Sequence, residues 1–205
     1  MVTMGTTIIS DTTGIILVGG KSRRMGVDKA FLEIDGQPLF ERVLEVFRAT
    51  FRRIILVGGR HDRYSRYGLP VHPDIYPGSS LGGLHTGLVH AETPHVFVAS
   101  CDLPYPSGAV ARHLHALRDG WDGVVPAGPD GCEPLFAVYS ARCREPMLRF
   151  LERGNYCILD LYPGLNIRYV PVEELSHLEG AERTFINVNT PEEFARAEGR
   201  GAPWR

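Results

Sequence analysis

A short apolar run at residues 15–18 ends abruptly at two glycines, Gly19 and Gly20. The run has no polar alternation, which is typical of a strand buried on both faces of a parallel sheet. Four cations lie in the next nine residues: Lys21, Arg23, Arg24 and Lys29. Glycines let a backbone approach a ligand closely, and exposed N–H groups with cations suit polyphosphate. The sequence therefore predicts a strand followed by a nucleoside triphosphate loop, with a solvated basic turn as the simpler interpretation.

Two common phosphate-binding motifs do not fit this loop. A P-loop needs a glycine five residues before Gly20, and Ile15 occupies that position. A dinucleotide fingerprint needs Gly-x-Gly-x-x-Gly, whereas the glycines here are Gly19, Gly20 and Gly26. The loop is therefore of a different kind.

Strands and helices alternate along the rest of the chain. Further strands are predicted over residues 54–57, 71–74, 96–102, 123–126, 135–139, 167–170 and 185–188. Helices are predicted over residues 39–47, 61–67, 81–90, 106–117, 145–151 and 156–161, and from Thr190, where threonine, proline and two acids form a helix start. Asp35 and Gly36 predict a hairpin turn. This order indicates a three-layer α/β fold with a mostly parallel central sheet.

Length and composition limit the class of protein. The 205 residues, 43% hydrophobic and 22% charged, fit one globular domain. We expect a flexible segment over residues 1–13, a single domain over 14–198 and a frayed tail over 199–205. A net charge of −2 gives no general attraction to nucleic acid, and no apolar run is long enough to span a membrane. The start lacks the pattern of a signal peptide, and the four cysteines form no CxxC pair, so we expect a reduced, cytoplasmic enzyme.

The carboxyl ends of the first and third buried strands should meet at one edge of the sheet. In open α/β sheets ligands bind there, and right-handed crossovers would place Arg24, Lys29 and Asp102 around one cleft. Mg²⁺ takes one or two carboxylates together with substrate phosphates, so Asp102 is the predicted metal ligand. The alternative is an aspartate that caps the turn before Pro104. Nucleotidyl transfer brings two anions together, so the site needs cations more than a base.

The first motif, residues 17–29, reads Leu-Val-Gly-Gly-Lys-Ser-Arg-Arg-Met-Gly-Val-Asp-Lys. It resembles the signature of nucleotidyltransferases, and within them most closely that of the molybdenum cofactor guanylyltransferases. The resemblance continues through Asp74, Gly82, Gly83, Asp102 and residues 185–192, nearly the whole chain. Val18 stands where that family has alanine, beside the expected base pocket. The family's nucleotide-contacting asparagine after the second strand is missing, because residues 57–59 are Val-Gly-Gly.

The resemblance implies a Rossmann-like nucleotidyltransferase fold and a GMP transfer from GTP to molybdenum-molybdopterin, with Mg²⁺ as cofactor. It implies that Lys29 contacts the nucleotide while Arg24 steadies the β- and γ-phosphates, so that Arg24, Lys29 and Asp102 are catalytic. The implied nucleotide-binding residues are Leu17, Val18, Gly19, Gly20, Arg24, Lys29, Asp74, Gly82, Gly83 and Asp102. Proteins that deliver and receive the cofactor are further implied partners.

Several interpretations stay open at this point. Asp74 contacts guanine or ribose, or is an exposed loop acid beside Pro73. Gly82 and Gly83 admit the nucleotide to a helix start or allow close packing, and Gly87 is expected to serve packing. Asn187 and Asn189, on one face of a strand, bind the pterin-bearing acceptor or only join the strand to the next helix. The alternative activities are a cytidylyltransferase for the same pterin, another sugar- or small-molecule-phosphate nucleotidyltransferase, and a nucleotide-sensing domain without chemistry.

Overall fold

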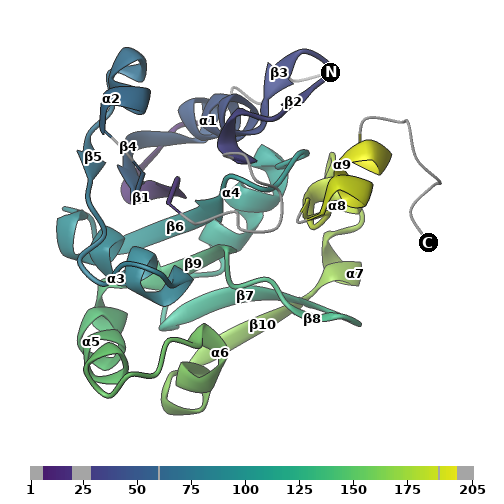
Figure 1. The fold of residues 1–205 in the computed structure, drawn as a ribbon. Coiled ribbons are helices and arrows are strands. Elements are labelled where there is room, and N and C mark those ends of the chain that lie inside the picture. The colour runs from purple at the N-terminus through teal and green to yellow at the C-terminus, as the bar shows by residue number, and fades with distance from the viewer. Residues whose placement is uncertain (1–6, 20–28, 60, 189, 198–205) are drawn as a thin grey trace.

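The computed structural model describes residues 7–19, 29–59, 61–188 and 190–197 (Figure 1). Within this part of the chain, the central sheet has eight strands in the order β10-β7-β9-β6-β1-β4-β5, with β8 paired to β7. The strands are β1 (Ile9–Leu17), β4 (Phe51–Val57), β5 (Val71–His72), β6 (His95–Ser100), β7 (Gly123–Gly128), β8 (Gly131–Cys132), β9 (Phe136–Ser140) and β10 (Ile167–Pro171). β9 runs antiparallel to β6 and β7, and β8 antiparallel to β7, while the other pairs are parallel. The predicted mostly parallel sheet is confirmed.

Helices cover both faces of this sheet (Figure 1). One face packs against α1 (Leu39–Thr50), α4 (Gly108–Ala116), α7 (Val172–Leu175) and α8 (Ala181–Thr184). The other packs against α3 (Ser80–His90), α5 (Arg144–Glu152) and α6 (Ile158–Leu161). The central strands β1, β4 and β6 bury side chains on both faces, as Ile16 and Ile15 of β1 do. This accounts for the continuous apolar runs, and the three-layer α/β fold is confirmed.

The shorter elements follow local sequence rules. β2 (Glu33–Ile34) and β3 (Gln37–Pro38) form the predicted hairpin, with Asp35 at a φ of 53° and Gly36 at 76°. Thr190 opens α9 (Pro191–Ala197): its hydroxyl accepts from the N–H of Glu193, whose carboxylate accepts from the N–H of Thr190. This reciprocal pair is a capping box. The remaining short helices are η1 (Lys29–Phe31), α2 (His61–Tyr64), η2 (Ser65–Tyr67), η3 (Ala141–Cys143) and η4 (Tyr162–Gly164).

The start of the first strand and the strand predicted over residues 185–188 differ from the structure. β1 begins at Ile9, so residues 9–13 belong to the sheet and not to the N-terminal segment. In its polar start Ser10 and Asp11 are exposed but Thr12 and Thr13 are buried, and the hydroxyls of Thr13 and Thr93 share a hydrogen bond of 2.7 Å. Residues 185–188 are not a strand. They follow α8 as a loop, and Val188 packs in a small separate cluster with Ile34, Leu39 and Ala197.

Candidate active site

Three acidic residues follow three separate strands of the sheet, spread across it from β5 to β8. Asp74 follows β5, Asp102 follows β6 and Glu133 follows β8. β1 lies between β4 and β6, with Leu17 aligned to Val57 on one side and to Ser100 on the other. The chain leaves β1 toward β4 and later returns to the opposite side, so the edge where these parallel strands end contains a switch point of the topology. Ligands of open α/β sheets bind at such a point.

The backbones that follow β1 and β4 touch each other at Gly19 and Gly58, which leaves no room for side chains there. A Cβ on Gly58 would lie 2.7 Å from the Cα of Gly19, so the two backbones are in direct contact. Gly58 and Gly59 have φ values of 80° and 69°, which favour glycine. Gly19 itself is exposed at the edge, as a phosphate-binding loop requires.

Val18 does not line an open pocket with its side chain. The residue is buried in the core beside Tyr64, and its N–H donates to the carbonyl of Val57 at 2.9 Å. Its place beside the base pocket stays a prediction. Lys29 begins η1, and its side chain is outside the described atoms. Gly20, Arg24 and Asn189 lie outside the described residues.

Asp74 is a half-buried and anchored carboxylate. Its Oδ1 accepts hydrogen bonds of 3.1 Å from the N–H of Tyr76 and from the hydroxyl of Thr86 on α3. Burial raises the pKa of Asp74 despite these two donors. Among the described residues no donor reaches Oδ2, which points to the region of Leu17 and Gly83. One carboxylate oxygen is thus available to a ligand, and Asp74 is half-buried where the alternative interpretation expected an exposed loop acid.

The three glycines of α3 lie where a Cβ would clash with a neighbouring residue. A Cβ on Gly82 would lie 2.0 Å from the carbonyl oxygen of Tyr76, and one on Gly83 would lie 3.2 Å from Leu17. On Gly87 it would lie 2.3 Å from Ile15, so the packing role predicted for Gly87 is confirmed. Ser79 caps this helix by accepting from the N–H of Gly82 at 3.0 Å. Gly82 and Gly83 hold α3 and its preceding loop against the end of β1.

Asp102 lies two residues beyond β6, and hydrogen bonds hold both its backbone and its side chain. Its carbonyl accepts from the N–H of Val188 at 3.0 Å, and Oδ1 accepts from the hydroxyl of Ser100. No donor reaches Oδ2 among the described residues. A carboxylate oxygen is the type of ligand that Mg²⁺ takes, and one carboxylate with substrate phosphates suffices. The described residues contain no group of three or more His, Cys, Asp or Glu side chains placed for a metal, so Asp102 fits a site that substrate phosphates complete.

Glu133 lies near Asp102 and Asn187, and the sequence analysis did not single it out. Its Oε2 accepts from the Asn187 amide at 3.5 Å, and this amide also donates to the carbonyl of Phe185 at 3.4 Å. Burial and then the nearby charges of Asp102 and Asp130 raise the pKa of Glu133, against the effect of Asn187. The only available signal was its place after the turn at residues 130–131, and that turn was not recognised. Asn187 and Asp102 therefore meet at this edge although residues 185–188 form no strand.

An arginine, Arg183, lies near the segment that carries Asn187. The guanidinium carbon of Arg183 lies 3.4 Å from the centre of the Tyr105 ring, and the Tyr105 hydroxyl donates to the carbonyl of Ala197 at 2.6 Å. This stacking holds an exposed arginine near the segment that carries Asn187.

Residues 14–169 match the family described as the MobA-like NTP transferase domain. The chain belongs to this family. A probable molybdenum cofactor guanylyltransferase from Pelotomaculum thermopropionicum is 37% identical over 186 residues, which cover 90% of this chain and 91% of the relative. A molybdenum cofactor guanylyltransferase from Vibrio parahaemolyticus is 35% identical, with 91% and 95% of the two chains covered. The resemblance that the first motif indicated is confirmed, and this MobA-like transferase is a nucleotidyltransferase.

Solved structures agree with this assignment. The molybdopterin-guanine dinucleotide biosynthesis protein A from Archaeoglobus fulgidus has a TM-score of 0.81 and 30% identity to this MobA-like transferase, covering 92% of this chain and 97% of the other. A 4-diphosphocytidyl-2C-methyl-D-erythritol synthase from Anaerococcus prevotii has a TM-score of 0.67 at 14% identity, which shows a shared fold only. In the part of the chain that the structure describes, every helix is too short or too polar to cross a membrane.

Proposed function

We propose that this chain transfers GMP from GTP to molybdenum-molybdopterin, forming the molybdopterin guanine dinucleotide cofactor and pyrophosphate. The observation that carries the proposal is the order of groups along one sheet edge: Asp74, then Gly19, then Asp102, then Glu133 with Asn187. This order suits a guanine, a triphosphate, a metal and an acceptor in sequence. The names of the relatives support the same substrates.

In this reaction an oxygen of the acceptor phosphate attacks the α-phosphorus of GTP. The bond from the α-phosphorus to the bridging oxygen breaks, and pyrophosphate leaves with the electron pair. The acceptor phosphate is already ionised at neutral pH, so no side chain has to remove a proton. We assign the β- and γ-phosphates to Arg24 and a nucleotide contact to Lys29, because an arginine fork holds two oxygens and a lysine acts as a point charge.

Asp102 would hold Mg²⁺, with Ser100 orienting its carboxylate. The ion, when bound, supplies positive charge to the reacting phosphates. Asp74 Oδ2 accepts from the N–H groups of the guanine edge, which offers two donors. The backbones of Leu17, Val18, Gly19, Gly20, Gly82 and Gly83 surround the nucleotide. We assign binding of the pterin-bearing acceptor to Asn187 and Asn189, and Asn187 contacts Glu133.

A panel of nucleotides tests the base assignment. Pyrophosphate release is measured with GTP, ITP, CTP, ATP and UTP at matched concentrations, with loaded molybdopterin and Mg²⁺. We expect GTP to exceed CTP by tens-fold or more, since each polar group left unpaired costs about 1–3 kcal/mol. ITP lacks only the exocyclic amine and should fall between them. Preference for CTP would indicate the cytidylyltransferase, and no turnover with any nucleotide would indicate the nucleotide-sensing domain.

We also propose that the protein works in the cytoplasm, with proteins that deliver and receive the cofactor as partners. The absence of disulfides among the four cysteines, all of which lie in the described part, supports a reducing compartment. Fractionation of cells that express a tagged full chain would test the location.

A further inference from the structure

Residues 51–55 of β4 have no strand partner on one side among the described residues. β1 pairs with β4 along one side, but on the other side β5 aligns only with Leu56 and Val57. The N–H of Leu56 points to this second side, because it donates to the carbonyl of Pro70 at 2.9 Å. Backbone groups alternate along a strand, so the N–H and C=O groups of Arg52 and Ile54 also point to the open side.

Pro70 is the reason that β5 does not extend further. In the observed register, the carbonyl of Ile54 would accept from the backbone nitrogen of residue 70, and proline has no N–H. Among the described residues, no backbone hydrogen bond reaches Arg52 or Ile54 from this side. The edge therefore offers the groups that another strand would pair with.

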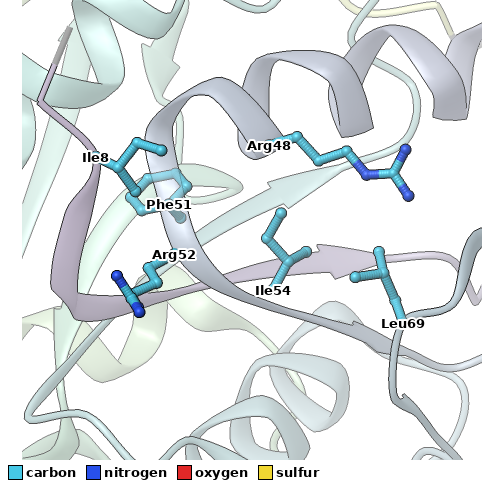
Figure 2. Close-up of a pocket in the computed structure, with 6 residues that line it drawn as sticks. All are labelled: Ile8, Arg48, Phe51, Arg52, Ile54 and Leu69. Carbon is cyan, nitrogen blue, oxygen red and sulfur yellow. The ribbon is translucent and has the colours of Figure 1, made fainter.

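A depression of about 340 Å³ lies beside this edge. Figure 2 shows its lining: Ile8, Phe51, Ile54 and Leu69 supply apolar side chains, and Arg48 and Arg52 supply the two charges. Ile54 packs with the α1 side of the sheet, whereas Ile55 packs with the α3 side. Arg52 shares the face of Ile54, and Arg53 lies on the opposite face. The depression thus combines apolar surface with charge of one sign.

The two arginines of the depression form no ion pair with a carboxylate of the described residues. Arg48 donates to the carbonyl of Tyr67 at 2.8 Å, and neither it nor Arg52 is paired with a carboxylate. Nearby arginines differ: Arg66 lies 3.3 Å from Glu41, and Arg53 lies 3.9 Å from Glu92. Two uncompensated cations beside an apolar surface favour an acidic ligand.

We propose that the open edge of β4 binds an extended acidic segment of another protein, which adds to the sheet as a strand. An apolar side chain of that segment enters the depression, and carboxylates two residues before and after it meet Arg48 and Arg52. Strand addition supplies backbone hydrogen bonds, and alternate side chains supply specificity. A second copy of this chain is disfavoured, because the β4 edge of that copy contains two arginines and no acidic residue to meet Arg48 and Arg52.

The surface is separate from the active site. It lies near the start of β4, whereas Asp102 follows the end of β6, and both strands run parallel to β1. Binding here therefore leaves the catalytic edge accessible, and its test does not depend on the proposed reaction.

The test uses a labelled peptide, Ac-Thr-Glu-Thr-Leu-Thr-Glu-Thr-NH₂, titrated into the full chain. We expect saturable binding by fluorescence anisotropy, with the largest amide shifts in NMR spectra at residues 51–55. Arg52→Glu should weaken binding about tenfold or more, because it reverses a charge that meets a carboxylate. The matched control Arg53→Glu, on the opposite face, should change it less than about twofold. Both residues are exposed, and thermal unfolding checks that both variants fold.

Two further peptides test the strand geometry. One is N-methylated at the Glu and Leu positions and the other at the Thr positions. In an added strand only one of these sets points to β4, so only one peptide should lose binding. Equal binding of all three peptides, or equal binding by the Arg52→Glu variant, would overturn the proposal. Concentration-dependent dimerisation of the chain that shifts the same amides would assign the edge to a second copy and also overturn it.

Discussion

The backbone carbonyl of Asp102 and the N–H of Val188 form a hydrogen bond of 3.0 Å across the end of β6. This bond brings a late segment of the chain to the acid that follows the third buried strand. It positions Asn187, one residue earlier, within 3.5 Å of Glu133. The contact between Asp102 and Val188 is made by backbone atoms, so side-chain substitutions at Asp102 leave it in place.

Asp102→Asn should abolish transfer with little effect on folding. The amide keeps the shape and can still accept from Ser100, but it loses the charge that would hold Mg²⁺. We expect a thermal unfolding midpoint close to that of the parent and a large loss in pyrophosphate release. Near-normal rates at limiting Mg²⁺ would remove Asp102 from the metal site.

Arg24→Lys tests geometry against charge at a residue outside the described part of the chain. Lysine keeps one positive charge but lacks the planar fork, and loss of one preorganised donor costs on the order of 10²-fold in rate. The measurement is kcat with GTP at saturating Mg²⁺. If the lysine variant turns over as fast as the parent, Arg24 is not a bidentate phosphate ligand.

Gly87→Ala should destabilise the fold through contact with Ile15. The new methyl would lie 2.3 Å from Ile15 Cδ1, and both residues are buried. Overpacking costs about 1–3 kcal/mol, from which up to about 1 kcal/mol of improved helix propensity is subtracted. Urea unfolding gives the change in free energy.

Two controls define the cause of that change. Gly164→Ala places its methyl in open space, so it should alter the free energy of unfolding little. Ile15→Val removes the clashing carbon and should partly rescue Gly87→Ala in the double variant. A double variant whose cost equals the sum of the single costs would show that Ile15 is not the contact responsible.

The free energy of unfolding should fall as the pH is lowered from about 7.5 to 5.5. Burial lowers the pKa of four histidines below 6.5: His72, His85, His95 and His115. The unfolded chain therefore takes up protons near pH 6.5 that the folded chain does not. Their stabilising contribution is present above pH 6.5 and is lost as the pH falls through the folded values.

Denaturant unfolding at several pH values measures this effect. We expect the free energy of unfolding to rise with pH, a slope that corresponds to net uptake of protons on unfolding. His85→Leu should reduce the slope, because His85 is 4% exposed and its Nδ1 has no partner among the described residues. His177→Leu, at an exposed position, is the matched control. An unchanged slope in the His85 variant would exclude this histidine as a source.

Local sequence rules predicted the elements whose partners are close along the chain. The Asp35–Gly36 turn and the Thr190 cap depend on backbone geometry within a few residues. The buried strand at residues 15–18 was recognisable because it is apolar on both faces. Its polar extension to Ile9 was not, because Thr13 is buried by a hydroxyl partner 80 residues away.

The site was predictable in part for the same reason. Asp102 follows a buried strand, so topology indicated that it shares an edge with the loop after Val18, whereas Asp74 was indicated only by the resemblance. Glu133 comes after a short antiparallel turn, and its partner Asn187 lies 54 residues later. The strand predicted over residues 185–188 failed because its backbone bonds to the Asp102 carbonyl and not to a neighbouring strand. Such contacts depend on tertiary structure that sequence periodicity does not contain.

The cluster of Ile34, Leu39, Val188 and Ala197 has a consequence for local opening. It joins the β2–β3 hairpin to the α9 region and lies apart from the two larger cores. A small cluster of this kind can open as a unit at a lower free energy than the whole fold. In native-state hydrogen exchange, the Val188 amide should therefore exchange together with those of the hairpin and ahead of the central strands. The acceptor side of the edge would then loosen while the nucleotide side stays ordered.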